Sequence, residues 1–390
     1  MRKQGRIANE SSVDSRAGGM KKQAKQGAER SRAAAAKKRA KAAANPREDA
    51  LTARPSLARM RRALLDWYGK NQRTLPWRES RDGYRVWLSE VMLQQTRVAA
   101  VLEHYAEFLR RFPSLQALAA APVEEVLAAW SGLGYYRRAR MFHAAAREVA
   151  TQREGRIPQT SRELRLLQGV GRYTAAAVAS IAFGEAVAVV DGNVERILER
   201  IDGRPRRGEE LWARAQELLE PREAGEWNQA MMDLGATICT PQTPACAACP
   251  WREFCRTRGA LPQLPQPARK KKTVRYALIR RGDKVLLTQR PADAAQMPGL
   301  WELPEYEGAA APAKGAAHAK KPAAAHRVTV SQEPGTVLLR LRHSITETDY
   351  AVEVLAAEAS QRRSASAWFD EAGWRALPLT GLARKILRRL

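Results

Sequence analysis

The first pattern in the sequence is a helical spacing of apolar residues. Between residues 53 and 258, apolar side chains recur three and four positions apart, as in Val101, Tyr105, Phe108 and Leu109. This spacing places them on one face of a helix. Short segments with Gly or Pro separate such stretches. We therefore expect residues 53–258 to form a mainly α-helical domain.

A second pattern begins after residues 259–273, a basic and proline-rich stretch that indicates an extended linker. From residue 274 onward the apolar period becomes two, which is typical of strands. A smaller α+β domain is therefore expected over residues 274–390. Its predicted elements are strands at Val274–Ile279 and Lys284–Gln289, joined by a turn at Gly282-Asp283, further strands at Val337–Leu341 and Tyr350–Leu355, and a final helix at Leu382–Leu390.

Charge adds a third segment and a class of partner. The first 50 residues hold 14 Lys or Arg and 5 Asp or Glu, within a chain whose formal net charge is +26. We expect residues 1–52 to be a disordered basic tail, with a mitochondrial transit peptide as the alternative. A chain this basic favours nucleic acid as its partner, although a ribosomal protein would have a similar charge.

The sequence shows neither a secretory signal nor a run of about 20 apolar residues that could span a membrane. The expected location is therefore the cytoplasm, at the nucleoid of a bacterium, and the expected state is a monomer without a membrane partner.

All four cysteines lie in one short segment, with the spacing C-x6-C-x2-C-x5-C. They are Cys239, Cys246, Cys249 and Cys255. Four thiolates from one loop suit either a tetrahedral zinc ion or a four-iron cluster. Structural zinc more often comes from two close CxxC pairs, and only one is present here, which favours the cluster. Either centre could serve only to hold the loop together.

Two carboxylates stand out from their surroundings. Glu90 is the one acid in an apolar and amide segment, WLSEVMLQQT, where burial in a cleft would raise its pKa and make it a proton donor. The alternative is an exposed surface glutamate. Asp191 ends an apolar run before a helical pattern. It can be a helix N-cap, a carboxylate beside a reacting sugar, or both.

A glycine turn, Gly169 to Gly171, directly precedes an Ala-rich helical pattern. Glycines there allow backbone N–H groups at a helix N-terminus to approach a phosphate. An ordinary tight turn between two helices would have the same sequence.

In combination these segments resemble the A/G-specific adenine DNA glycosylases, a branch of the helix-hairpin-helix superfamily that includes endonuclease III. The resemblance covers about residues 57–390. It rests on LPWR at Leu75, WLSEVMLQQT at Trp87, GLGYYRRAR at Gly132, GVGRYTAAAV at Gly169, VVDGNVERIL at Val189, NQAMMDLGATIC at Asn228 and the cysteine loop.

The resemblance implies a catalytic unit of two helical lobes with a cleft between them, into which adenine is flipped from a duplex containing an A:G or A:8-oxoguanine mismatch. It implies that Glu90 protonates the adenine and that Asp191 stabilises the oxocarbenium-like sugar. Tyr173 and Asn193 match residues that support this site. The family's further features match DNA-wedging residues at Gln95 and Tyr135, a phosphate-binding hairpin at Gly169 and Gly171, and a [4Fe-4S] cluster on Cys239, Cys246, Cys249 and Cys255.

The second domain resembles a Nudix fold through KVLLTQRP at Lys284 and GLWELP at Gly299. No glutamate-rich Nudix metal box follows Gly299 in the sequence, so the resemblance implies a module that recognises the oxidised guanine without hydrolase activity. His343 and Ser344 are its candidate contacts. The next residues, Ile345-Thr346-Glu347, replace the Phe-Ser-His of the best-known members.

Two other functions follow from other readings of the residues. A bifunctional pyrimidine glycosylase with lyase activity, like endonuclease III, needs a lysine to form a Schiff base, and this chain has Tyr173 at that position. A DNA-binding module without catalysis would not need the two carboxylates.

Overall fold

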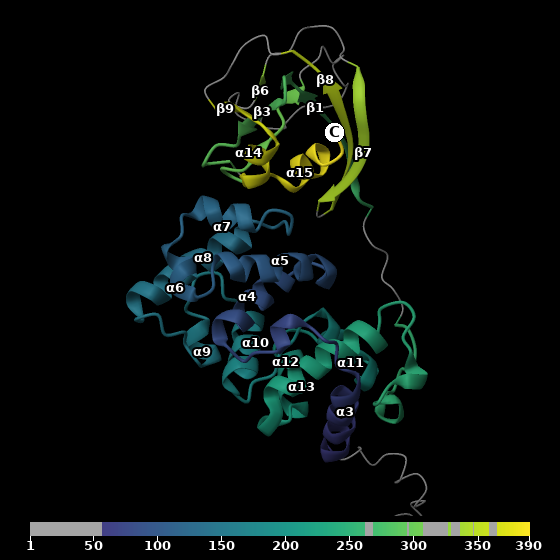
Figure 1. Cartoon of the computed structure of the whole chain (residues 1–390). Helices are drawn as coiled ribbons and strands as arrows, with labels where there is room; N and C mark the ends of the chain where they lie inside the picture. Colours follow the sequence, from purple (N-terminus) through teal and green to yellow (C-terminus); the bar gives the residue numbers. More distant parts are fainter. Residues whose placement is uncertain are drawn as a thin grey trace, which may run out of the picture. The chain divides into compact units, whose positions relative to one another are not determined.

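The computed structural model describes residues 57–261, 268–294, 296–306, 327–328, 336–345, 347–358 and 365–390. Figure 1 shows its helices and strands. The basic tail predicted at residues 1–52 lies outside the described residues. In the described part of the chain, every helix is too short or too polar to cross a lipid bilayer.

The region from residue 57 to residue 261 is helical, which confirms the first prediction. Its elements are α3 (Leu57–Asn71), η1 (Pro76–Arg78), α4 (Gly83–Leu93), α5 (Val98–Arg111), α6 (Leu115–Ala120), α7 (Val123–Ala129), α8 (Arg137–Gln152), α9 (Ser161–Leu164), α10 (Arg172–Phe183), α11 (Gly192–Asp202), α12 (Gly208–Leu218), η2 (Pro221–Glu223), α13 (Ala224–Asp233), η3 (Leu234–Ile238), η4 (Cys246–Ala248) and η5 (Arg252–Phe254).

These helices form two lobes, each with its own apolar core. One core contains Trp87, Phe108 and Trp130 and is built from α4 to α8 together with α10. The other contains Leu64 and Trp227 and is built from α3 and α11 to α13. Helix α3 therefore packs against the end of the helical region rather than against its neighbours in sequence.

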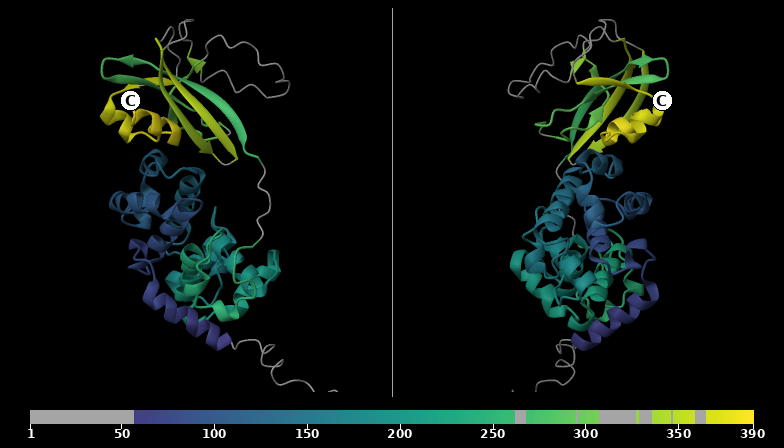
Figure 2. Two further views of the ribbon diagram at one scale, coloured as in Figure 1. Left: turned by 90° about the vertical axis from the view of Figure 1, so that its right-hand side faces the viewer. Right: turned by 60° about the vertical axis from the view of Figure 1, so that its left-hand side comes forward.

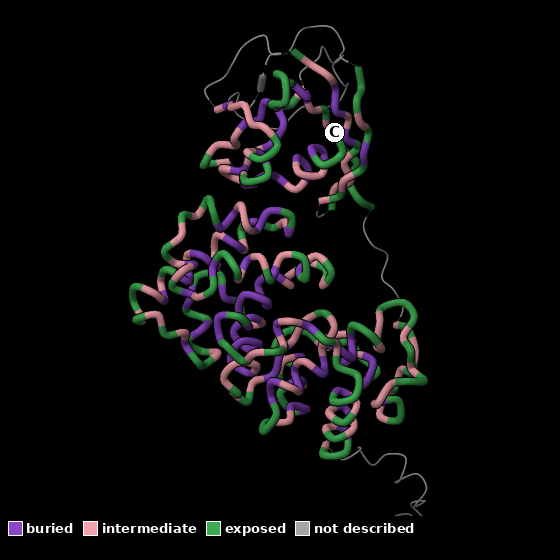
Figure 3. Tube along the Cα trace, viewed as in Figure 1, coloured by how far each residue is buried: buried purple, intermediate pink, exposed green. Residues whose placement is uncertain are grey.

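Helix α4 runs through the interior of the first lobe. Its N-cap is Asp82, whose carboxylate accepts a hydrogen bond from the Arg85 amide at 2.9 Å. From Gly83 to Met92 every residue except Arg85 is buried, as Figure 3 shows for this part of the tube. A helix that is apolar on nearly all sides is stable only inside a core, and here it carries Glu90 into the interior.

The C-terminal domain contains two sheets and two helices. Its elements are β1 (Lys270–Leu278), β2 (Arg280–Arg281), β3 (Lys284–Gln289), β4 (Trp301–Glu302), β5 (Glu305–Tyr306), β6 (Arg327–Val328), β7 (Val337–Ile345), β8 (Thr348–Ala356), β9 (Ser366–Phe369), α14 (Glu371–Ala376) and α15 (Gly381–Leu387). One sheet has the order β6-β5-β1-β8-β7, and the other contains β2, β3, β4 and β9. Figure 2 shows both helices beside the sheets, and their buried residues share a core with them. The predicted α+β class is confirmed.

The predicted turn at Gly282-Asp283 is present, but the predicted strands before and after it lie in different sheets. The turn at Gly282 has a φ of +60° and joins β3 to the short strand β2, not to β1. Strand β1 instead pairs in parallel with β8 in the other sheet. The chain passes between the sheets at the buried Ile279, as strands do at the corners of packed sheets. Strand β1 also begins at Lys270, within the stretch expected to be linker.

Candidate active site

A pocket of about 210 Å³ lies between the two helical lobes and contains both predicted carboxylates. Glu90 comes from α4, Tyr173 from the first turn of α10, and Asp191 and Asn193 from the start of α11. Residues far apart in the sequence thus meet at one point. The lining residues are Arg73, Leu75, Trp77, Arg78, Val86, Ser89, Glu90, Leu93, Thr96, Val98, Tyr173, Ile181, Asp191, Asn193, Gln229, Met232 and Ala236.

Glu90 has the electrostatics of a proton donor. Its side chain is buried, and the residue is 5% exposed. Burial raises the pKa of Glu90 to about 7, and the negative charge of Asp191 adds to this, while the Tyr173 hydrogen bond and Arg78 oppose it. Loss of solvation destabilises the charged form of a carboxyl group. Near neutral pH, therefore, a large fraction of Glu90 carries a proton that it can give to a base.

Tyr173 orients this carboxyl group. Its hydroxyl donates a hydrogen bond to Glu90 Oε2 at 2.8 Å. Burial raises the pKa of Tyr173 well above its usual value, and the charges of Glu90 and Asp191 raise it further. The phenol therefore keeps its proton and remains a donor.

Asp191 is both the N-cap of α11 and a wall of the pocket. Its Oδ1 accepts hydrogen bonds from the amides of Asn193 at 2.9 Å and Val194 at 2.8 Å. Its Oδ2 accepts from Asn193 Nδ2 at 2.8 Å. The other side-chain atom of Asn193, Oδ1, accepts from Arg196 at 2.8 Å. These contacts fix the direction of the Asp191 carboxylate. Asp191 can therefore be both a helix N-cap and a carboxylate beside a reacting sugar.

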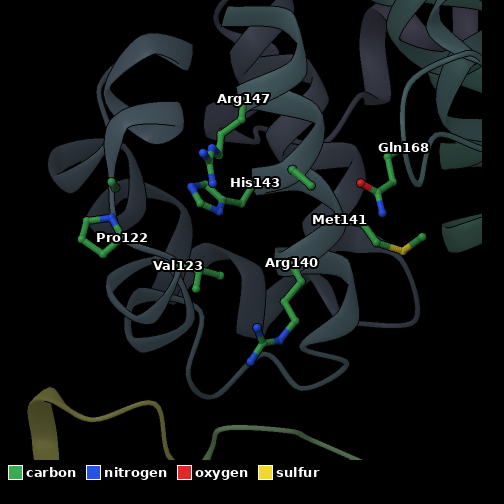
Figure 4. Close-up of a pocket in the computed structure, with 9 residues that line it drawn as sticks. Pro122, Val123, Arg140, Met141, His143, Arg147 and Gln168 are labelled. Atoms are coloured by element: carbon green, nitrogen blue, oxygen red, sulfur yellow. The ribbon is translucent and has the colours of Figure 1, made fainter. Parts of the chain in front are cut away.

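The arrangement supplies one proton donor and one fixed carboxylate in a single pocket. Two carboxyl groups in different protonation states are what cleavage of a glycosidic bond requires. A larger pocket, of about 390 Å³, lies elsewhere in the first lobe and is lined by Arg140, His143, Arg147 and Gln168, among others. Figure 4 shows these side chains without any carboxylate among them. Size therefore does not identify the candidate active site, because of these two pockets only the smaller one is lined by acids.

The glycine turn precedes α10 as predicted. Gly169 has a φ of +79°, and a Cβ there would lie 2.6 Å from the Cβ of Met141, so a side chain is excluded by both strain and space. Gly171 is the N-cap of α10, without any side-chain hydrogen bond to the first turn. The first N–H groups of α10 therefore have no side-chain cap and can bind an anion.

Gln95 and Tyr135 do not line the pocket but occupy two exposed turns beside α4 and α8. Their φ angles are +54° and +47°, a conformation that costs energy for residues other than glycine and often occurs at functional sites.

Sequence reasoning missed Arg138, which holds both turns. One guanidinium nitrogen, Nη1, donates to the carbonyls of Val91, Met92 and Gln94. The other, Nη2, donates to Thr96 Oγ1 and to the carbonyls of Leu133 and Gly134. The guanidinium also lies over the ring of Tyr135, 5.5 Å from its centre. The GLGYYRRAR motif contains Arg138, but its contacts are too far away in sequence to be predicted from spacing.

Two family models match the chain. Residues 88–221 match the HhH-GPD superfamily of base excision DNA repair proteins, and residues 275–389 match the NUDIX domain. The chain is thus similar to HhH-GPD proteins in its helical region and to NUDIX domains in its C-terminal domain.

The predicted resemblance to adenine DNA glycosylases is confirmed. The human adenine DNA glycosylase is 48% identical over 218 residues, which cover 52% of this chain and 40% of the human protein. The Schizosaccharomyces pombe adenine DNA glycosylase is 39% identical over 224 residues, or 51% of this chain and 49% of that protein. The corresponding Buchnera aphidicola protein from Schizaphis graminum is 34% identical over 218 residues, or 54% of this chain and 63% of that protein. The chain thus matches less than two thirds of each relative.

Two solved structures are similar to separate parts of the chain. A thermostable thymine-DNA glycosylase is 28% identical, with a TM-score of 0.49, and the match covers 52% of this chain and 96% of that one. A MutT NUDIX hydrolase from Burkholderia pseudomallei is 21% identical, with a TM-score of 0.23, and the match covers 31% and 98% of the two chains.

The four cysteines follow the HhH-GPD domain and surround one small cavity. Donors reach two of their sulfurs. Arg200 donates to Cys239 Sγ at 3.2 Å, and the amide of Arg258 donates to Cys255 Sγ at 3.4 Å. In the described residues no three His, Cys, Asp or Glu side chains are placed to hold one metal ion. All four thiols nevertheless line one shared cavity, and the loop is compatible with a cluster.

In the NUDIX domain, His343 and Ser344 are neighbours on β7, opposite Tyr350 and Asp349 of β8. The Ser344 hydroxyl donates to Asp349 at 2.7 Å. Burial lowers the pKa of His343, and Lys385 lowers it further, so the imidazole is neutral near pH 7. Of the three replaced residues, Thr346 lies outside the described part of the chain. Most residues between Gly299 and His343, where a Nudix box would lie, are also outside the described part of the chain.

Proposed function

We propose that this chain is a monofunctional adenine DNA glycosylase, which hydrolyses the N-glycosidic bond of adenine paired with guanine or 8-oxoguanine. One observation carries the proposal: the buried Glu90, with its pKa raised to about 7, shares a pocket with the fixed carboxylate of Asp191. The names of the relatives, all adenine DNA glycosylases, support adenine as the base.

In the proposed reaction, Glu90 protonates the adenine so that it leaves as a neutral base. Tyr173 holds the Glu90 carboxyl group through its hydrogen bond. Asp191, which Asn193 orients, stabilises the positive charge that develops on the sugar. An enzyme can reach this bond only after the nucleotide has been flipped out of the duplex.

The residues around the pocket support the proposed absence of lyase activity. A lyase forms a Schiff base through a lysine amine. Among the described residues that line this pocket there are two arginines, Arg73 and Arg78, and no lysine. The position that carries the lysine in endonuclease III-like enzymes is Tyr173, whose hydroxyl donates a hydrogen bond to Glu90.

Duplex DNA is the proposed partner. The uncapped start of α10 offers N–H groups to a phosphate, and the exposed turns at Gln95 and Tyr135 offer an amide and an aromatic ring to fill the gap left by a flipped base. The net charge of +26 favours binding to any nucleic acid. We place a [4Fe-4S] cluster on Cys239, Cys246, Cys249 and Cys255, where it would order the basic loop that contains Arg252, Arg256 and Arg258.

The test is adenine release from duplexes that carry adenine opposite guanine, 8-oxoguanine or thymine. We expect release opposite both guanines, little opposite thymine, and an intact abasic strand that borohydride does not trap on the protein. Release of an oxidised pyrimidine, or efficient borohydride trapping, would favour the bifunctional alternative. DNA binding without release of any base would favour a DNA-binding module.

A further inference from the structure

Asp233 is a buried carboxylate behind the wall of the active-site pocket, and the proposed function does not use it. It is the last residue of α13 and is 0% exposed. Two arginines surround it. Arg78 donates to both of its oxygens at 2.8 Å, and Arg73 donates to Oδ1 at 2.9 and 2.6 Å and through its amide to Oδ2 at 3.2 Å.

Both arginines line the pocket that contains Glu90, and Asp233 does not. Arg78 belongs to η1 and Arg73 to the loop that precedes it, and Asp233 is the acceptor that their side chains share. The carbonyl of Arg73 also accepts from Arg78 at 3.1 Å. Burial alone would raise the pKa of Asp233, but the hydrogen bonds and charges of the two arginines lower it overall. Asp233 is therefore an anion inside the protein.

We infer that Asp233 is a positioning residue, which holds Arg78 and Arg73 at the pocket wall and balances the positive charge that they bring close to Glu90. Arg78 and Asp233 are the charged residues of two of the sequence motifs, LPWR and NQAMMDLGATIC. The inference rests on the proposed function for its activity measurement only.

The charges around Glu90 decide the sign of the effect. The groups that act on it are Tyr173 from α10, Asp191 before α11, and Arg78 from η1, whose positive charge lowers the pKa of Glu90. Asp233 does not line the pocket but accepts hydrogen bonds from both Arg78 and Arg73. Removing the charge of Asp233 leaves Arg78 uncompensated, so Glu90 should lose its proton at a lower pH. Removing Arg78 should have the opposite effect.

The experiment measures single-turnover adenine release against pH. With wild type, release needs protonated Glu90 and should fall above about pH 7. In Asp233→Asn the fall should begin ~1 pH unit lower, so that release decreases about ninefold at pH 8 but only about twofold at pH 6. In Arg78→Gln the fall should begin at a higher pH. Asp233→Glu keeps the charge and should keep the wild-type pH dependence, even if its overall rate is lower.

Asp202 provides a matched control. It is also a carboxylate held by two arginines, Arg206 and Arg214, at 2.6 and 3.1 Å, and it does not line the pocket. Asp202→Asn should cost stability and leave the pH dependence unchanged. The inference is wrong if Asp233→Asn and Asp202→Asn slow release equally at every pH.

A second measurement does not depend on activity. Infrared titration of protein with isotope-labelled glutamate follows the protonation of its carboxyl groups. Subtracting the spectra of the same protein with Glu90→Gln leaves the signal of Glu90 alone. It should show a lower pKa in Asp233→Asn than in wild type, and an unchanged value would overturn the inference. If wild type releases no adenine, the proposed function is wrong, and this titration still decides the role of Asp233.

Discussion

At the scale of single residues, the acids of this chain differ in whether arginines reach them. Asp202 and Asp233 each accept hydrogen bonds from two arginines, which hold their pKa values below the usual range. Glu90 has a tyrosine as its hydrogen-bond partner instead, and burial raises its pKa. The chain contains 67 Lys and Arg. A direct ion pair with any of them would lower the pKa of Glu90, so Glu90 stays protonated only where no basic side chain contacts it.

The raised pKa of Glu90 predicts how its substitution changes stability with pH. The folded protein binds this proton more tightly than the unfolded chain does, so the stabilisation is present below pH 4.5 and is lost as pH rises through about 7. The shift corresponds to roughly 3 kcal/mol. Glu90→Gln should therefore gain on the order of 3 kcal/mol of unfolding free energy relative to wild type between pH 4.5 and pH 8, measured by urea unfolding.

The control for this prediction is Glu103→Gln, at an exposed position of α5. Its difference from wild type should stay the same at both pH values. If Glu90→Gln behaves like this control, then Glu90 titrates as an ordinary surface acid and cannot be the proton donor.

Single residues were predictable from sequence where the local context was unusual. Glu90 was identified because its segment offers little polar surface, and Asp191 because it stands between an apolar run and a helix. Arg138 and Asp233 were not, because an arginine or aspartate gives no local sign of partners on other elements. Their roles depend on contacts that only the folded chain brings together.

At the scale of elements, the two turns that carry Gln95 and Tyr135 depend on one arginine. Arg138→Gln should release six hydrogen bonds to these turns. We expect a loss of ~2–4 kcal/mol in unfolding free energy and adenine release at least ~10-fold slower, because misplaced wedging residues hold the duplex open less well. Thermal unfolding and the fluorescence of 2-aminopurine beside the mismatch measure the two effects.

The neighbouring residue supplies the control, since Arg137 is exposed at the start of the same helix. Arg137→Gln removes the same charge without the hydrogen bonds to the turns. Equal effects of the two substitutions would mean that Arg138 acts only through its charge on DNA.

The cysteine loop makes a prediction about metal content. The purified protein should be yellow-brown with about four irons per chain, as a cubane cluster requires. Cys249→Ser should weaken both folding and DNA binding, because the ligands order a loop with little secondary structure. Stoichiometric zinc without iron, after anaerobic preparation, would show that the cluster assignment is wrong.

Most elements were predictable from the period of their apolar residues. Strand β3 has the predicted bounds, and the helical region follows the three-and-four spacing. The pairing of β1 with β8 was not predictable, because the period of a strand contains no information about its partner. The passage between sheets at Ile279 lies in a continuous apolar run, Ala277 to Ile279, so the sequence does not show that β1 and β3 belong to different sheets.

At the scale of the whole molecule, the proposed chemistry lies entirely in the helical region, and the NUDIX domain is the candidate reader of the opposite base. The candidate residues of this domain have few hydrogen-bond donors for a base. The Ser344 hydroxyl already donates to Asp349, and a neutral His343 has a single N–H donor. The exposed Glu347 cannot donate a hydrogen bond when ionised. The domain should therefore contribute a modest preference for 8-oxoguanine.

This role predicts a change in discrimination without a change in chemistry. The double substitution His343→Ala and Ser344→Ala should lower the ratio of adenine release opposite 8-oxoguanine to that opposite guanine about 5- to 30-fold, the value of one or two hydrogen bonds. Release opposite guanine should hardly change. Arg342→Gln is the control for a general loss of DNA binding, because it removes a positive charge beside His343 on the same strand; it should slow release opposite both guanines equally. An unchanged ratio in the double variant would exclude these residues as the reader.

The central claim is that protonated Glu90 is the acid that releases adenine, and its most direct test is single-turnover release from an A:G duplex by wild type and Glu90→Gln. The substitution keeps the shape of the side chain and removes its transferable proton. We expect release to fall by at least ~10²-fold, while binding of the same duplex, measured by gel mobility, stays within a few-fold of wild type. Release by Glu90→Gln at a rate close to that of wild type would contradict the account.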